Sequence, residues 1–493
     1  MTSASVRNIS SRLSGPTLVA AKVWLAGAAI FLPLTYLLLH GQYSMAVAIM
    51  VLVGLILMWL GNHTLSLSAL LLFLLLLGDE RRILVYLVGG SGLDPLVIVG
   101  AALSVYLSVP LLLRLKLTDT ITKTIFAFMV LMILEIFNPK QGSILVGVSG
   151  ALFYLVPLLW FWVGRTYGTE RMMFILLFRV LLPLGVLDAL VGYYQAIFGP
   201  LPWQVAWLAQ FAQGYVYHGD HIRSFGFSTG ALEYNTVLLA STVVVIAAVL
   251  AGRRAYGLLL ILFVPAMIIA SSRGGIVRLL FAGSLIFAVM GRTSRAWIPR
   301  LIFALAVGLG MTFYLASNAA GSTESVDEQT TAQMATQHVV EGLSDPAHST
   351  ATAHAGMITN GVVVGILNPI GYGLGSTTLA AGKFGGNGFS SEFEVSDCFI
   401  SMGIFGGLLY LGVAFVVFRS LFSYVRTAPR LMGLTAVGVL SATFGLWFAL
   451  GQYSFSFLLF FIVGIVTRPQ LIAAIQPGLA LNNAGNTLAP VTA

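Results

Sequence analysis

The chain has 493 residues, of which 58% are hydrophobic and only 9% are charged. Soluble domains carry about 25% charged residues, so this composition excludes a soluble globule and predicts an all-α polytopic membrane protein. The single cysteine, Cys398, excludes an intramolecular disulfide and a cysteine-based metal cluster. The net charge of +8 does not indicate nucleic-acid binding, because the basic residues form short clusters between apolar runs, as cytoplasmic anchors of membrane helices do.

Long apolar runs along the chain predict its membrane spans and the loops between them. A membrane-spanning helix needs about 20 apolar residues, and about 14 segments approach that length. We expect them near residues 23–39, 43–60, 65–77, 94–113, 121–137, 144–163, 172–190, 231–250, 255–270, 274–290, 297–316, 398–418, 431–449 and 452–467. The predicted regions are a cytoplasmic N-terminal segment (1–22), membrane helices (23–190), a first periplasmic loop (191–230), membrane helices (231–316), a large periplasmic catalytic loop (317–397), membrane helices (398–467) and a cytoplasmic tail (468–493).

One region fits this alternation poorly. The third segment, 65–77, is short, and the charged residues at 79–82 would fall on the outer side. A miscounted pair of helices or a re-entrant segment near 65–93 would also explain the pattern.

Ionisable residues inside apolar runs are the first functional candidates, because a charge in hydrocarbon is rarely kept without a use. Arg273 stands in Ser271-Ser272-Arg273-Gly274-Gly275, at an outer junction of two spans. Its planar fork suits a phosphate, although a terminal arginine also reaches the membrane interface without a ligand. Arg278 either shares a cavity with Arg273 or pairs with an acid such as Asp188. Arg179 and Glu135 are further ionisable residues inside apolar runs.

The first outer loop contains His218, Asp220 and His221, which lie close enough in sequence to bind a metal. We favour the alternative, a polar loop rim, because no other His or Cys follows at ligand spacing. Arg223 precedes a glycine-containing turn that leads into the next span. It is the second candidate for a phosphate-binding arginine.

The second half of the long loop predicts a short helix. Ser349, Thr350 or Thr352 can cap it, and the run from about 353 to 367 ends at an Asn-Pro pair, before which helical geometry is disfavoured. His354 then lies in the first turn, where exposed N–H groups favour an anion and disfavour an imidazolium. A neutral histidine there can accept a proton from a hydroxyl nucleophile, whereas the alternative is a surface histidine without a function.

Four short motifs occur in an order that resembles one family. They are Arg-Ser-Phe-Gly-Phe at 223–227, Ser-Arg-Gly at 272–274, Asn-Pro-Ile-Gly-Tyr-Gly-Leu-Gly at 368–375, and Glu392 to Asp397 before Met-Gly-Ile-Phe-Gly-Gly-Leu at 402–408. Over residues 220–420 the chain looks like the O-antigen ligase and Wzy-type O-antigen or exopolysaccharide polymerase superfamily.

This resemblance implies a glycosyltransferase of the membrane GT-C type that needs no metal and no cofactor. It implies a place in the bacterial inner membrane, an active site facing the periplasm, and undecaprenyl-diphosphate-linked oligosaccharides as donor and acceptor. Partners would be the lipid bilayer, a chain-length regulator and a flippase. Arg223 and Arg273 match the family's diphosphate-binding arginines, with Arg278 and Ser272 beside them, and His354 matches its acceptor-activating residue.

The sequence departs from the family pattern in two places. Many relatives carry an arginine at the start of the loop helix and a His-Asn pair before the following span. This chain has His354 in the first place and Ser396-Asp397 in the second, so Asp397 or Glu394 is an alternative base.

Three other functions stay open from the sequence. A ligase that moves glycan to lipid A core or protein differs only in its acceptor. A transporter or flippase also has many spans and buried charges, but more often shows repeated halves. A non-catalytic export scaffold would not need arginines at the outer junctions.

Overall fold

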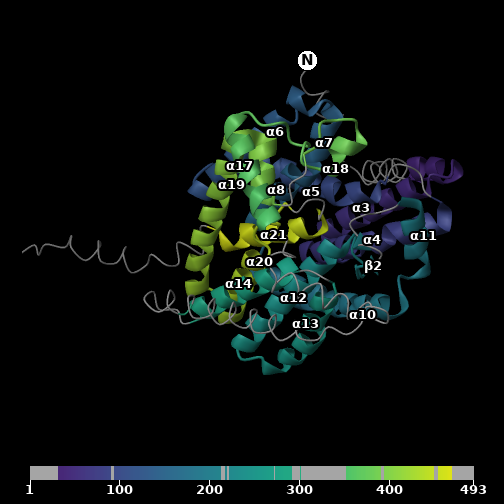
Figure 1. Ribbon diagram of the computed structural model, residues 1–493. Coiled ribbons are helices and arrows are strands. Elements are labelled where there is room, and N and C mark those ends of the chain that lie inside the picture. Colours follow the sequence, from purple (N-terminus) through teal and green to yellow (C-terminus); the bar gives the residue numbers. More distant parts are fainter. Residues whose placement is uncertain are drawn as a thin grey trace, which may run out of the picture.

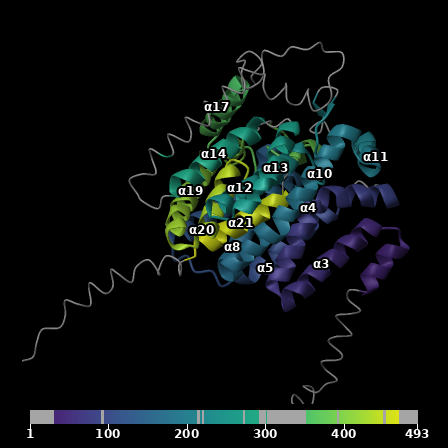
Figure 2. The same ribbon diagram turned by 90° about the horizontal axis from the view of Figure 1, so that it is seen from below.

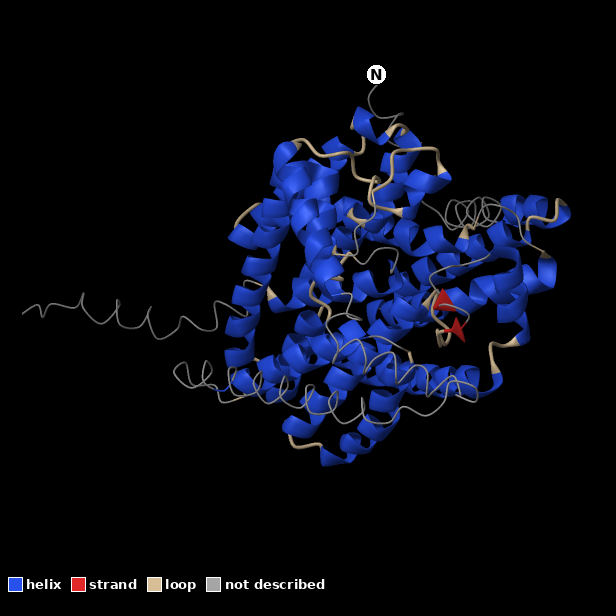
Figure 3. Ribbon diagram, viewed as in Figure 1, coloured by secondary structure: helices blue, strands red, loops and turns tan. Residues whose placement is uncertain are grey.

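The structure is a computed structural model that describes residues 31–89, 94–211, 217–218, 221–270, 273–290, 300, 351–389, 393–448 and 453–468. This part of the chain is almost entirely helical and contains one antiparallel ribbon of two-residue strands (Figure 3). The fold class predicted from composition is thus confirmed as helical.

The first half of the chain supplies nine of the described α-helices. Their bounds are α3 (Tyr43–Gly61), α4 (His63–Val88), α5 (Leu96–Leu112), α6 (Thr120–Glu135), α7 (Ile144–Phe153), α8 (Leu155–Tyr167), α9 (Glu170–Phe174), α10 (Leu182–Phe198) and α11 (Pro202–Phe211). A 3-10 turn η1 (Pro139–Gln141) and a π-helical segment η2 (Ile175–Leu181) join them.

The second half begins with the ribbon of β1 (Tyr217–His218) and β2 (His221–Ile222). The following elements are α12 (Ala231–Leu250), η3 (Arg254–Leu258), α13 (Leu259–Ile269), α14 (Arg273–Val289), α17 (Ala351–Leu367), α18 (Leu379–Lys383), α19 (Glu394–Thr427), α20 (Arg430–Ala442) and α21 (Tyr453–Val466) (Figure 1).

Five described helical segments are long and apolar enough to cross a membrane: Tyr43–Gly61, Ile144–Tyr167, Glu170–Phe198, Ala231–Leu250 and Glu394–Thr427. Six further apolar helices of 10–17 residues accompany them. The protein is therefore a helical membrane protein. The full count of about 14 spans remains a prediction.

The third predicted span, 65–77, lies within a longer helix. Helix α4 runs without interruption through the charged residues to Val88, so this region is one long helix. Asp79 is 4% exposed and Arg82 is 2% exposed. A charged cluster ends an apolar run in the sequence, but these charges have protein partners and stay inside the fold.

Glycines bring α8 and α21 into close contact at the centre of the molecule. The two helices lie side by side in both ribbon views (Figures 1 and 2). Gly164 faces the backbone of Phe461, and Gly464 faces the backbone of Phe161, with no room for a Cβ at either glycine. Small residues let membrane helices approach in this way, because packing rather than water exclusion drives their association.

Helix α19 is broken at Gly403, which has a φ of 64° and a ψ of −164°. The loop that follows α17 binds this break: the amide of Tyr372 donates to the carbonyl of Ile400 (3.0 Å), and that of Gly373 donates to Ser401 (2.9 Å). A Cβ at Gly403 would overlap the carbonyl oxygen of Pro369. The predicted span near 398–418 likewise lies within a longer helix, because Glu394–Asp397 already belong to α19.

Replacing Gly403 by alanine is expected to destabilise the protein by about 2 kcal/mol or more, because this backbone region is essentially reserved for glycine and the methyl group meets Pro369. The midpoint of thermal unfolding in detergent measures the effect. Gly412→Ala in the same helix is the matched control, since its Cβ would meet only the Thr124 methyl group at 3.7 Å. Equal midpoints for both variants would contradict the account of the break.

Candidate functional site

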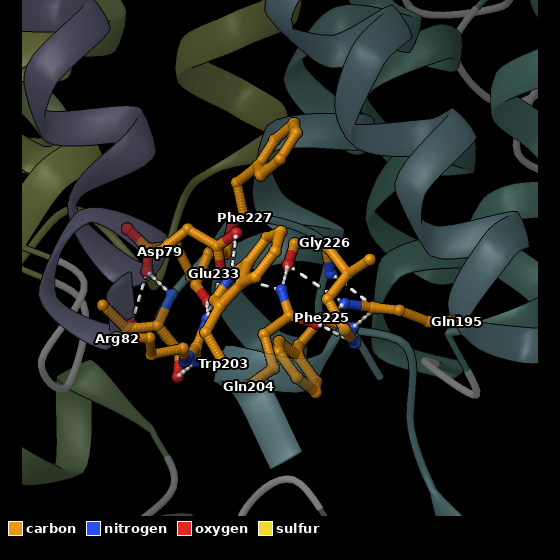
Figure 4. A network of polar contacts seen from close by, with 12 residues as sticks. Asp79, Arg82, Gln195, Trp203, Gln204, Phe225, Gly226, Phe227 and Glu233 are labelled. Carbon is orange, nitrogen blue, oxygen red and sulfur yellow. Dashed lines mark hydrogen bonds and ion pairs between the residues drawn. The ribbon is translucent and has the colours of Figure 1, made fainter. Parts of the chain in front are cut away.

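The loop that carries Arg223 is held by a buried polar network (Figure 4). Arg82, on α4, donates from Nη1 to the carbonyl of Ser228 (2.8 Å) and from Nη2 to that of Thr229 (2.9 Å). Its guanidinium also lies over the Phe225 ring, 4.5 Å from the centroid. Backbone carbonyls and an aromatic face thus accommodate a cation that water does not reach.

Asp79 supplies the negative charge of the network. Its carboxylate accepts from Arg82 Nη1 (3.3 Å), from Gln204 Nε2 (2.7 Å) and from the Trp203 indole (3.0 Å). Gln204 and Trp203 belong to α11, so one acid connects α4 to the segment that precedes the loop. Buried charges need such partners because an unpaired one is costly.

The other side of the loop is held from α10. Gln195 Oε1 accepts from the amides of Phe225 and Gly226, both at 2.9 Å. Asp188 Oδ1 accepts from the amide of Phe227 at 2.7 Å. Asp188 therefore serves the loop backbone, and its suggested pairing with Arg278 is wrong.

Arg82→Gln is expected to lower the free energy of unfolding by about 3 kcal/mol, because it leaves Asp79 buried without its cation. Thermal unfolding checks this, and Arg81→Gln on the same helix is the control. The Arg81–Asp94 side chains are 22% and 28% exposed, against 2% and 5% for Arg82–Asp79. A partly exposed pair contributes less than a buried one, so a loss as large in Arg81→Gln would argue against this network.

The starts of α12 and α14 meet behind this loop. The amide of Thr229 donates to Glu233 Oε2 (2.8 Å) in the first turn of α12. Two residues further on, Asn235 is fully buried and packs directly on Gly275 of α14. Gly275 is two residues after Arg273, about 3 Å along a helix axis. Arg273 therefore lies at the start of a helix that packs on α12, the helix that follows the loop of Arg223.

Asn235 has polar atoms directed at this junction. Neither its Oδ1 nor its Nδ2 forms a hydrogen bond within the described part of the chain. A buried amide normally has partners, so Asn235 is a polar group available where α12 and α14 meet.

A second group of charges lies deeper along α14. Arg278, five residues and about 7.5 Å beyond Arg273, interacts electrostatically with Glu394 at the start of α19. Glu394 is 3% exposed, and Asp397, in the same first turn, is 1% exposed. Glu394, and not Asp188, is therefore the acid that acts on Arg278, although no ion pair joins the two side chains in the described part of the chain.

The Glu394 carboxylate faces the Tyr410 hydroxyl and the backbone of Trp447 and Phe448. Neither carboxylate oxygen makes a hydrogen bond of normal geometry with a described residue, and neither does the Tyr410 hydroxyl. This group, Arg278 with Glu394 and Tyr410, is called the acidic cluster below. It offers an acid and a hydroxyl that the described residues satisfy incompletely, and a cation that acts on the acid.

Helix α17 brings the predicted loop helix to the same region. It spans Ala351–Leu367, which confirms the predicted helix of about 353–367 and the place of His354 in its first turn. Gly361 packs on Ser396, and Gly365 packs on Phe399, so α17 lies along the start of α19. Ser272 and the side chains of Arg273 and His354 lie outside the described residues, and whether the three predicted catalytic side chains meet remains a prediction.

The two histidines of the first outer loop pair across the ribbon, His218 opposite His221. Asp220, the third member of the suggested metal site, lies outside the described residues. Among the residues that the structure describes, no three His, Cys, Asp or Glu side chains gather at metal-binding distance.

Two site residues were missed by sequence reasoning. Asn235 and Tyr410 stand inside apolar runs, at 231–250 and 398–418, where counting apolar residues treats a lone polar residue as part of the span. The signal was present, since amides and hydroxyls in membrane helices usually serve helix contacts or sites. The residues that they face, Gly275 on α14 and Glu394 in the first turn of α19, come next to them only after folding.

Comparison of the chain with protein-family models, with curated proteins and with solved structures finds no match. Evidence on function therefore comes from the site residues themselves.

Proposed function

We propose that the protein is a Wzy-type polysaccharide polymerase, a metal-independent GT-C-type glycosyltransferase of the bacterial inner membrane. It transfers an undecaprenyl-diphosphate-linked glycan, of the O-antigen or exopolysaccharide kind, to an acceptor sugar hydroxyl at the periplasmic face. The proposal rests on one observation. Helix α12, which follows the Arg223 loop, packs against the start of α14, which contains Arg273, and the contact is between Asn235 and Gly275. Two arginines at one outer membrane boundary suit a diphosphate.

The reaction needs little from the protein beyond positioning and charge. The acceptor oxygen attacks the anomeric carbon of the donor, the bond from that carbon to the diphosphate oxygen breaks, and the acceptor proton passes to a base. Arg223 and Arg273 stabilise the charge that develops on the departing diphosphate. Fixed cations aimed at developing charge are commonly the largest catalytic term, and the network around Arg82 keeps the Arg223 loop fixed for that purpose.

The base is His354 in this proposal. Its place in the first turn of α17 puts it on the helix that packs against the start of α19. Glu394 and Asp397 are the alternative proton acceptors, and both are buried in that start.

Two related functions use the same features. A ligase would move the finished glycan to lipid A core or protein through the same arginines. A flippase would use the buried charges to pass the lipid-linked glycan across the membrane, without forming a glycosidic bond.

Deletion of the gene, followed by analysis of surface glycans, separates these functions. A polymerase deletion leaves single repeat units on the surface. Loss of all attached glycan would point to a ligase or a flippase, and an unchanged polymer would contradict all three functions. Re-expression of the intact chain should restore the original length distribution.

A further inference from the structure

The C-terminal half of α19 carries a groove that the proposed transferase activity does not use. Its lining consists of aromatic and basic side chains from one helix face: Phe415, Phe418, Arg419, Phe422, Ser423 and Arg426. The groove has a volume of about 490 Å³.

Helical geometry gathers these side chains. Arg419 and Arg426 are seven residues apart, which is two turns and about 10 Å along the axis. The opposite face of α19 packs into the protein, where Val417 and Leu421 are fully buried and Val425 is 6% exposed. The groove face therefore points away from the core.

The arginines are exposed and form no ion pair with any acid in the described part of the chain. Arg426 is next to the last residue of α19, whereas Arg419 lies eight residues, about 12 Å, before that end. Arg419 directly follows the predicted span 398–418, so both arginines lie where the headgroups of the bilayer are expected. Long arginine side chains can extend along the helix toward the headgroup layer.

We propose that this groove binds an anionic phospholipid of the surrounding bilayer. Arg419 and Arg426 converge on the lipid phosphate, and the Ser423 hydroxyl between them donates to it. An acyl chain lies along Phe415, Phe418 and Phe422. Basic pockets on membrane helices recognise anionic headgroups in this way, and the charge of the groove favours them over zwitterionic lipids.

The test compares phosphatidylglycerol with phosphatidylcholine on the purified full-length protein. Native mass spectrometry counts retained lipid, and thermal unfolding measures stabilisation by each added lipid. Arg419→Gln/Arg426→Gln should bind phosphatidylglycerol about 30-fold more weakly, which corresponds to about 1 kcal/mol for each arginine. Arg253→Gln/Arg254→Gln, an exposed basic pair between α12 and α13, is the control and should bind like the unmodified protein.

Equal stabilisation by both lipids, or unchanged phosphatidylglycerol binding in the double variant, would overturn the proposal. So would a dimer in the unmodified protein that the double variant loses while neither retains lipid, because a second copy would then cover the groove. If the double variant cannot be purified, the two single variants serve, and each should lose part of the selectivity for phosphatidylglycerol.

Discussion

Arg273→Ala should abolish polymer formation in cells, with a fall in transfer rate of about 100-fold or more. That size follows from the loss of a fixed positive charge at the leaving group. Arg273→Lys should also be poor, because an ammonium cannot bond two phosphate oxygens as a planar fork does. The length distribution of surface polysaccharide in a deletion strain that carries each variant measures the effect.

The control for this series is Arg254→Ala, an exposed arginine in the turn before α13, which should leave the polymer unchanged. Each variant must reach the membrane in amounts equal to the unmodified protein. Full-length polysaccharide from Arg273→Ala under these conditions would remove Arg273 from the mechanism.

Variants of the acidic cluster should change the stability of the protein, and a single change should cost more stability than the double change. Arg278→Gln leaves Glu394 buried without the cation that acts on it, so the midpoint of thermal unfolding should fall. The double change Arg278→Gln/Glu394→Gln removes both charges and should recover most of that stability, because replacing both members of a buried pair costs far less than breaking it.

Activity separates a structural pair from a functional one. If the pair belongs to the site, the double variant is stable but makes little polymer. A double variant that regains both stability and full polymer length would show that the acidic cluster only supports the fold. Glu170→Gln is the control, because Glu170 accepts a hydrogen bond (3.1 Å) from the Tyr424 hydroxyl, far from Glu394 on α19. This variant should not shorten the polymer.

Much of the helical layout follows from the sequence. The run at 231–250 coincides with α12, and the loop helix ends at Leu367, directly before the Asn-Pro pair. These elements are set by local signals, namely continuous apolar residues and a proline that disfavours helix before it.

The errors have one physical cause. Apolar counting treats a charge as the end of a span, but Arg82 stays within α4 because Ser228 and Thr229 supply carbonyls from a distant loop. The break at Gly403 depends similarly on Pro369. Arg278 is a candidate from the sequence, but Glu394, the acid that acts on it, lies on another helix, and the sequence contains no reason to choose it over Asp188. The local sequence pattern predicts the helices, whereas contacts between residues far apart in the sequence can be identified only from the folded structure.

Glycosyl transfer by the isolated protein tests the central claim most directly. Purified protein in detergent is mixed with undecaprenyl-diphosphate-linked oligosaccharide from the host strain, and mass spectrometry follows both the glycan and the released lipid diphosphate. We predict longer lipid-linked glycans together with free undecaprenyl diphosphate, and neither product with Arg273→Ala. An unaltered lipid-linked oligosaccharide in the presence of folded, unmodified protein would contradict the assignment as a transferase.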